Sequence, residues 1–163
     1  MSNAKQATAS KSAQESGFNQ AISLLTTSGT LELNVLSVGA SADWVLPLTL
    51  VLATVPLTAQ DVTKHQVTWE GKTYPLAKVT TDSGFSFALI IEGMQDELRY
   101  AIPLKEVPYA RKIRISALKD LDSVKGLIKE PAKNKYVYQY VQHEDQVWIV
   151  PDLESLELII KKN

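Results

Sequence analysis

The sequence predicts a mainly β protein made of many short strands, and three observations carry this prediction. Apolar residues recur with the two-residue period of a half-buried strand, or in short unbroken runs typical of a strand covered on both faces. Turn-forming residues separate these runs at close spacing, as in small barrels and sandwiches. The two halves of the chain also repeat one pattern, which favours two similar small barrels packed together.

Several segments show the strand pattern clearly. Leu31, Leu33 and Val35 alternate with their neighbours, as one face of a half-buried strand does. The run 85–91, FSFALII, lies between two glycines and is apolar throughout, so we expect it to be buried on both faces. A later strand is expected to place three aromatic rings on one face, namely those of Tyr136, Tyr138 and Tyr140.

Turn signals punctuate these strands at 70–72, 93–96 and 143–145. Two hairpins are therefore predicted, the first pairing 66–69 with 73–79 and the second pairing 138–142 with 146–150. The longest uncharged run, 44–60, contains Pro47 and Pro56. Because proline inside a membrane-spanning helix removes backbone hydrogen bonds, this run predicts a buried strand followed by a turn.

Two short helices are also expected. Ser116 can cap a helix over 117–122. The segment from Asp152 onward places Leu153, Leu156 and Ile160 on one stripe, with acidic residues in its first turn and lysines in its last. The alternation at 158–160 would also suit a final strand.

The repeat between the halves consists of an aromatic residue, two apolar residues, proline and leucine. It occurs as 44–48, WVLPL, and again as 100–104, YAIPL, with Val51 and Val107 three residues further on. A predicted hairpin follows each copy. Proline fits at the end or edge of a strand, where no ladder donor is needed.

Composition restricts the possible functions. The chain has 163 residues, of which 45% are hydrophobic and 21% charged, and a formal net charge of -1 from 17 Lys+Arg and 18 Asp+Glu. This balance provides no general field for nucleic acid or an anionic membrane. Since cysteine is absent, disulfides, thiolate zinc sites and a cysteine nucleophile are excluded. Residues 1–20 are expected to form a flexible leader without the apolar core of a signal peptide. Ser2, Asn3 and Ala4 look like a tag remnant, although the preceding Met1 also allows a native start.

The predicted first hairpin, HQVTWEGKTYPL at 65–76, resembles that of CheW-like domains through Trp69, Gly71, Pro75 and Leu76. The segments 44–51, 87–93, 98–107 and 146–156 also resemble the family's strands in the same order. The resemblance covers about 22–158 and implies a domain, taken as 21–160, of two interlocked five-stranded SH3-like barrels with short helices.

The resemblance also implies a function. CheW-like domains are non-catalytic, cytoplasmic adaptors that couple methyl-accepting chemoreceptors to a CheA-like histidine kinase, without a cofactor or a metal. Because it has a tryptophan in this hairpin, the sequence is most similar to the family variants of type IV pilus and twitching systems, PilI and ChpC. The implied protein-binding residues lie on the hairpin and on the strand before it; they are Val51, Ala53, His65, Trp69, Glu70 and Gly71.

Three of these positions depart from the family pattern. Glu70 stands where the hairpin has arginine, His65 where it has glycine, and Ala53 where an acid commonly follows the valine by two residues. Exchange of a guanidinium for a carboxylate reverses the local charge, so a partner carboxylate would be repelled. We therefore expect either a partner with compensating charges or weak coupling.

Other candidate sites have simpler interpretations. His65 and His143 show no metal-ligand spacing and are expected at turns or on the surface. Lys105, with Arg111, Lys112 and Arg114, forms a basic cluster expected at a solvated strand edge, or else as half of a charge-steered interface. Trp69 is either an interface anchor or a barrel-core residue.

Two other classes of function compete with the adaptor, namely an enzyme on a β-barrel and a divergent small β-barrel interaction or nucleic-acid-binding module unrelated to chemosensing. Nucleophile elbow, P-loop and dinucleotide motifs are absent from the sequence, and acids such as Asp96, Glu97, Glu144 and Asp145 fall in predicted turns, so an enzyme is disfavoured. A small barrel that binds nucleic acid would need exposed aromatic residues on a positive face, which the near-neutral charge disfavours.

Overall fold

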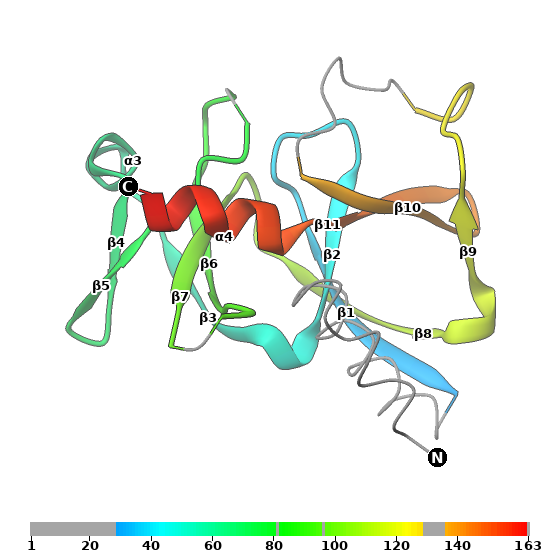
Figure 1. Cartoon of the computed structure of the whole chain (residues 1–163), viewed down its shortest axis with the longest axis horizontal. Coiled ribbons are helices and arrows are strands. Elements are labelled where there is room, and N and C mark those ends of the chain that lie inside the picture. Colours follow the sequence, from blue (N-terminus) through cyan, green and yellow to red (C-terminus); the bar gives the residue numbers. More distant parts are fainter. Residues whose placement is uncertain (1–28, 81, 96, 129–135, 163) are drawn as a thin grey trace.

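The computed structural model describes residues 29–80, 82–95, 97–128 and 136–162 (Figure 1). The predicted leader, 1–20, lies outside these residues. The described strands form two lobes. Lobe A is a six-stranded sheet with the order β8-β1-β2-β11-β10-β9. Its strands are β1 (Thr30–Leu36), β2 (Asp43–Pro47), β8 (Tyr109–Arg114), β9 (Leu118–Leu121), β10 (Val137–His143) and β11 (Gln146–Pro151).

Lobe B combines a three-stranded sheet, β3-β6-β7, with the hairpin β4-β5. Its strands are β3 (Val51–Pro56), β4 (Gln66–Trp69), β5 (Lys72–Pro75), β6 (Phe87–Glu92) and β7 (Arg99–Leu104). A parallel bridge between Leu76 and Ala101 joins the hairpin to β7. Helix α3 (Ala59–Lys64) precedes β4, and helix α4 (Leu153–Lys162) runs from the end of β11 toward the hairpin of lobe B (Figure 1).

The two halves of the chain exchange strands between the lobes. β1 and β2 of the first half pair with β8 and β11 of the second. β6 and β7 of the second half pair with β3 and, through the Leu76 bridge, with the first hairpin. The order β8-β1-β2-β11-β10 in lobe A thus corresponds to β3-β6-β7-β5-β4 in lobe B. The prediction of two similar, interlocked lobes is confirmed, and lobe A adds β9 as a sixth strand to the five that were expected.

The core has three layers, and strand alternation assigns side chains to them. Ala88 and Ile90 of β6 enter the interior of lobe B, whereas Leu89 and Ile91 enter the layer between the lobes. In β11, Trp148 and other alternate residues enter the interior of lobe A, and the rest enter the same shared layer. This double coverage explains the unbroken apolar run of β6, predicted at 85–91 and found at Phe87–Glu92.

The C-terminal helix is confirmed, and the alternative final strand is wrong. Leu153 and Leu156 are buried on the predicted stripe. Asp152 stabilises the first turn, because its carboxylate accepts hydrogen bonds from the backbone and hydroxyl of Ser155 at 3.2 and 2.7 Å.

The predicted helix over 117–122 is wrong. A 3-10 helix, η3 (Ile115–Ala117), leads instead into β9. β9 pairs with β10 from Leu118 opposite His143 to Leu121 opposite Tyr140. A six-residue helix has little stability of its own, so the ladder hydrogen bonds offered by β10 determine the conformation.

Two strand predictions need correction. The first hairpin ends at Pro75 instead of Val79, because β4 begins at Gln66 and Leu76 turns to pair with Ala101. The tyrosines near β10 do not share one environment, since a register shift lies between Val137 and Gln139. Tyr138 is 42% exposed, while Tyr136 and Tyr140 are buried.

Candidate interaction site

The hairpin β4-β5 lies at one end of the molecule (Figure 1). Its turn is formed by Glu70 and Gly71, which have φ angles of 51° and 78°. Positive φ at both central residues is the type I′ geometry that matches the twist of a two-residue hairpin. A Cβ atom on Gly71 would meet nothing within 4 Å, so backbone conformation is what favours glycine here. Both turn residues are exposed.

Trp69 is half-buried, intermediate between the two alternatives that the sequence leaves open. It lies on the same face of the hairpin as Val67 and Tyr74, as the strand register requires. The rings of Trp69 and Tyr74 are 6.1 Å apart and inclined at 44°. Both pack against the interior cluster of lobe B. Trp69 therefore contributes to the barrel wall and keeps part of its surface exposed next to the turn.

β3 brings Val51 and Ala53 into the same lobe. Both are half-buried, and they flank a bulge at which the β3–β6 register shifts. Val51 pairs with Ile91 and packs against the layer between the lobes. Further along β3, Val55 packs against the cluster that also receives Trp69. Val51 therefore packs toward the other lobe, and it is Val55 that shares an interior cluster with Trp69.

The structure separates His65 from the turn. His65 caps the C-terminus of α3 in the left-handed conformation, with φ of 55°, and its side chain is exposed as predicted. Its carbonyl accepts a hydrogen bond from the Leu76 backbone at 2.9 Å, at the end of the hairpin opposite Glu70. The four residues from His65 to Trp69 span about 13 Å of extended chain. The six predicted residues therefore do not form one compact patch.

Strand β5 borders a groove of about 480 Å³. Lys72, Tyr74 and Pro75 form one side of it, and Leu98 and Arg99 lie at the start of β7 on the other. Arg99 is held by Glu92, with 3.2 Å between Nε and Oε1. This groove therefore lies between β5 and the segment that leads into β7.

His143 contradicts the prediction of a surface or turn position. It is the last residue of β10 and only 8% exposed. Its ring stacks on Trp148 with 5.4 Å between centroids and 6° between planes. The guanidinium of Arg111 lies 5.7 Å from the centroid of the same tryptophan ring. His143 thus packs within lobe A.

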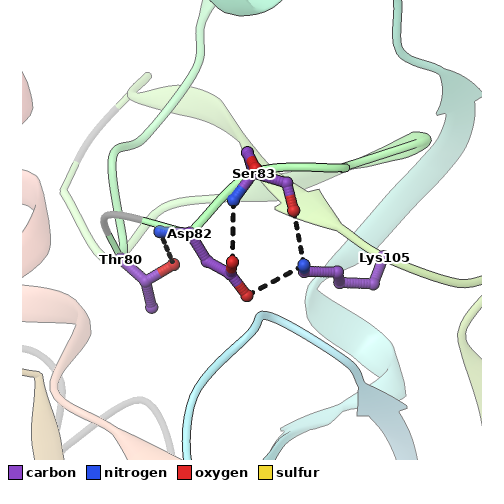
Figure 2. A network of polar contacts seen from close by, with 4 residues as sticks. All are labelled: Thr80, Asp82, Ser83 and Lys105. Atoms are coloured by element: carbon purple, nitrogen blue, oxygen red, sulfur yellow. Dashed lines mark hydrogen bonds and ion pairs between the residues drawn. The ribbon is translucent and has the colours of Figure 1, made fainter.

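Lys105 contacts a different part of the molecule from the other basic residues of its predicted cluster. Figure 2 shows its ammonium group between the Asp82 carboxylate, 2.8 Å away, and the Ser83 carbonyl. The hydrogen bond from Lys105, together with that from the Ser83 backbone, lowers the pKa of Asp82. Arg111, Lys112 and Arg114 lie on β8, the first strand in the order of the lobe A sheet, as the strand-edge interpretation predicts.

Glu157 is a buried carboxylate that the sequence pattern did not lead us to predict. Glu157 of α4 is fully buried and accepts hydrogen bonds from the Met94 and Gln95 backbones at 2.9 and 3.2 Å and from the Tyr100 hydroxyl at 3.0 Å. Desolvation raises the pKa of Glu157, and these hydrogen bonds oppose the rise. The sequence does contain a signal for this burial, because Glu157 lies next to Leu156 on the apolar stripe of α4.

Among the residues that the structure describes, no three histidine, aspartate or glutamate side chains gather where they could hold a metal ion. Within the same residues, no helix is both long enough and apolar enough to cross a membrane.

Comparison with known proteins identifies a solved structure with a similar fold. No family model matches the sequence, and no curated protein is significantly similar to it. Among solved structures, the scaffolding protein TtCheW from Thermoanaerobacter tengcongensis matches with a TM-score of 0.52 and 15% sequence identity. The match covers 77% of this chain and 91% of that protein. The chain therefore has a mainly β, CheW-like fold of two interlocked barrels.

Proposed function

We propose that the protein is a non-catalytic cytoplasmic adaptor that couples methyl-accepting chemoreceptors to a CheA-like histidine kinase. The observation that carries this proposal is the hairpin β4-β5. It combines the family-like residues Trp69, Gly71 and Pro75 with an exposed turn, on a CheW-like fold. An adaptor acts through surface complementarity, and a partly exposed tryptophan beside an exposed turn provides an anchor for it.

Glu70 determines the chemistry that a partner must offer. Its carboxylate is exposed at the tip of the hairpin, where the resembled family has arginine. A partner that meets this turn is expected to present lysine or arginine, since a carboxylate would be repelled. Because the hairpin has a tryptophan like the PilI and ChpC variants, we assign the adaptor to a type IV pilus or twitching system.

Affinity capture from the source cell tests the proposal. The purified full-length protein and its Glu70→Arg variant serve as bait, and captured proteins are identified by mass spectrometry. The chain also offers a matched control. Glu144 is exposed at the tip of the β10-β11 hairpin with φ of 54°, so Glu144→Arg makes the same charge reversal at the corresponding turn of lobe A.

The expected result is recovery of a chemosensory histidine kinase or chemoreceptor by the wild type and by Glu144→Arg, with several-fold weaker recovery by Glu70→Arg. Recovery of a kinase or receptor from a type IV pilus system would support the finer assignment. If none of the three baits recovers such a protein, the adaptor proposal is wrong and the likeness is one of fold alone.

A further inference from the structure

A second groove, of about 620 Å³, lies at the other end of the hairpin from Glu70. The segment following β5 forms one wall with Leu76 and Ala77, and α4 forms the facing wall with Leu156, Ile159 and Ile160. The groove thus lies between two segments that are about 80 residues apart in sequence. Its volume is in the range of sites that bury a few side chains of a ligand.

The α4 wall leaves apolar surface uncovered. Leu156 is buried beneath the groove, but Ile159, one turn further on, is 38% exposed. Pro75, which is exposed, and Tyr74, which is half-buried, line the facing wall. Covering such apolar surface stabilises a complex by roughly 25 cal/mol for each Å² removed from water. A partner's aliphatic or aromatic side chain would gain this contribution here.

The charged residues that line this groove have one sign. They are Lys64 and Lys78, and among the described residues that line the groove none is acidic. Lys64 and Lys78 are exposed, and the ion pairs found between described residues involve neither. Lys64 also complements the C-terminus of α3. Lys78 lies outside any helix and has no such role.

We propose that this groove binds an acidic segment of a partner protein, with an apolar side chain between Tyr74 and Ile159 and flanking carboxylates against Lys64 and Lys78. The proposal deepens the adaptor function, on which it rests for its biological partner, by adding a second contact surface. This second contact surface also includes His65, because His65 lines the groove and lies away from the Glu70 turn.

The test uses the full chain and a fluorescein-labelled peptide of about twelve residues in which leucine and phenylalanine alternate with pairs of glutamate. Binding is measured by fluorescence anisotropy at low and high salt. Exposed ion pairs each contribute modestly, so we expect Lys64→Glu combined with Lys78→Glu to weaken binding roughly tenfold. Lys119→Glu combined with Lys125→Glu, which makes the same charge change at exposed positions of lobe A, should bind like the wild type.

A second variant, Ile159→Ser, tests the apolar part of the site. Its side chain is partly exposed, so the fold should be retained and binding should weaken several-fold. A peptide in which lysine replaces every glutamate should not bind. Equal binding by the wild type and the Lys64/Lys78 variant would overturn the proposal. So would preferential binding of a labelled single-stranded oligonucleotide, or self-association of the chain that Ile159→Ser abolishes, because either would assign the groove another occupant.

These outcomes are separable from those of the capture experiment. If the peptide binds as expected but no kinase or receptor is captured, the groove proposal stands and the adaptor function fails. If a kinase is captured but the Lys64/Lys78 variant binds the peptide like the wild type, the groove proposal alone fails.

Discussion

The two lobes share one five-strand arrangement but differ in how extensively its strands pair. In lobe A, β11 pairs with β2 through Trp148 opposite Asp43 and Ile149 opposite Trp44. Its hairpin has strands of seven and six residues, and β9 pairs along β10. In lobe B, each hairpin strand has four residues, and the bridge between Leu76 and Ala101 connects the hairpin to β7.

This difference leads to a prediction of where partners bind. The shorter hairpin and the single bridge leave two grooves beside β5, and Tyr74 and Pro75 line each of them. Lobe A uses the corresponding positions for its parallel pairing and for the packing of Trp148. We therefore expect lobe A to be the more structural lobe and lobe B to carry the contact surfaces.

The largest expected effect comes from the tryptophans of the two hairpins. Trp148 is 1% exposed in the interior of lobe A, so Trp148→Ala should lower the free energy of unfolding by about 3–5 kcal/mol. Trp69→Ala removes a half-buried ring and should cost about 1–2 kcal/mol. Urea denaturation of both variants measures the contrast. Equal losses would mean that the lobe B hairpin is as structural as that of lobe A.

The next effect concerns Glu157, which holds α4 against the turn between β6 and β7. Glu157→Ala leaves the backbone N–H groups of Met94 and Gln95 without their acceptor and should cost about 1–3 kcal/mol. Glu157→Gln keeps an acceptor and should stay within about 1 kcal/mol of the wild type at neutral pH.

Glu157 also makes the stability of the protein depend on pH. Because the pKa of Glu157 is raised in the folded state, its contribution to stability is full below the ordinary value of 4.5 and falls as pH rises through the folded-state pKa. The wild type should therefore lose stability relative to Glu157→Gln over this range, which denaturation at several pH values measures. A relative gain with rising pH would contradict the assigned burial.

These features show how much of the structure the sequence could predict. The strands of β1 and β6, the turn at Glu70 and helix α4 follow from local periodicity and turn chemistry, and all were predicted. β9 and the burial of His143 depend on pairing and stacking with β10 and Trp148, which local patterns do not contain. The exposure of Tyr138 follows from the register shift in β10, which local sequence patterns likewise do not contain.

The candidate site was predicted in part. The residue types of the hairpin were identified, but the sequence could not show that His65 and Glu70 lie at opposite ends of it. The groove was missed because Lys64 and Ile159 become neighbours only when α4 packs against the hairpin.

A smaller effect is expected at the two hairpin turns. Glu70 and Glu144 both adopt positive φ, which asparagine tolerates better than glutamate. Glu70→Asn and Glu144→Asn should each raise the free energy of unfolding by up to about 1 kcal/mol. If Glu70→Asn stabilises the protein but weakens capture of the kinase or receptor, Glu70 serves binding at a cost in stability. Unchanged capture would count against a role for its charge.

The smallest expected effect is that of the ion pair in Figure 2. Because Asp82 has a lowered pKa, its contribution to stability is present above the ordinary value of 3.8 and is lost as pH falls through the folded-state pKa. The pair is partly exposed, so a double-mutant cycle of Asp82→Asn and Lys105→Met should give a small coupling that high salt reduces. A coupling unaffected by salt would contradict this assignment.

The central claim, that partners bind lobe B while lobe A supports the fold, is tested most directly by hydrogen–deuterium exchange of the full chain with and without its purified kinase. The account predicts slower exchange across the lobe B hairpin, 66–75, and unchanged exchange across the lobe A hairpin, 139–147. Protection confined to the lobe A hairpin, with 66–75 unaffected, would contradict it.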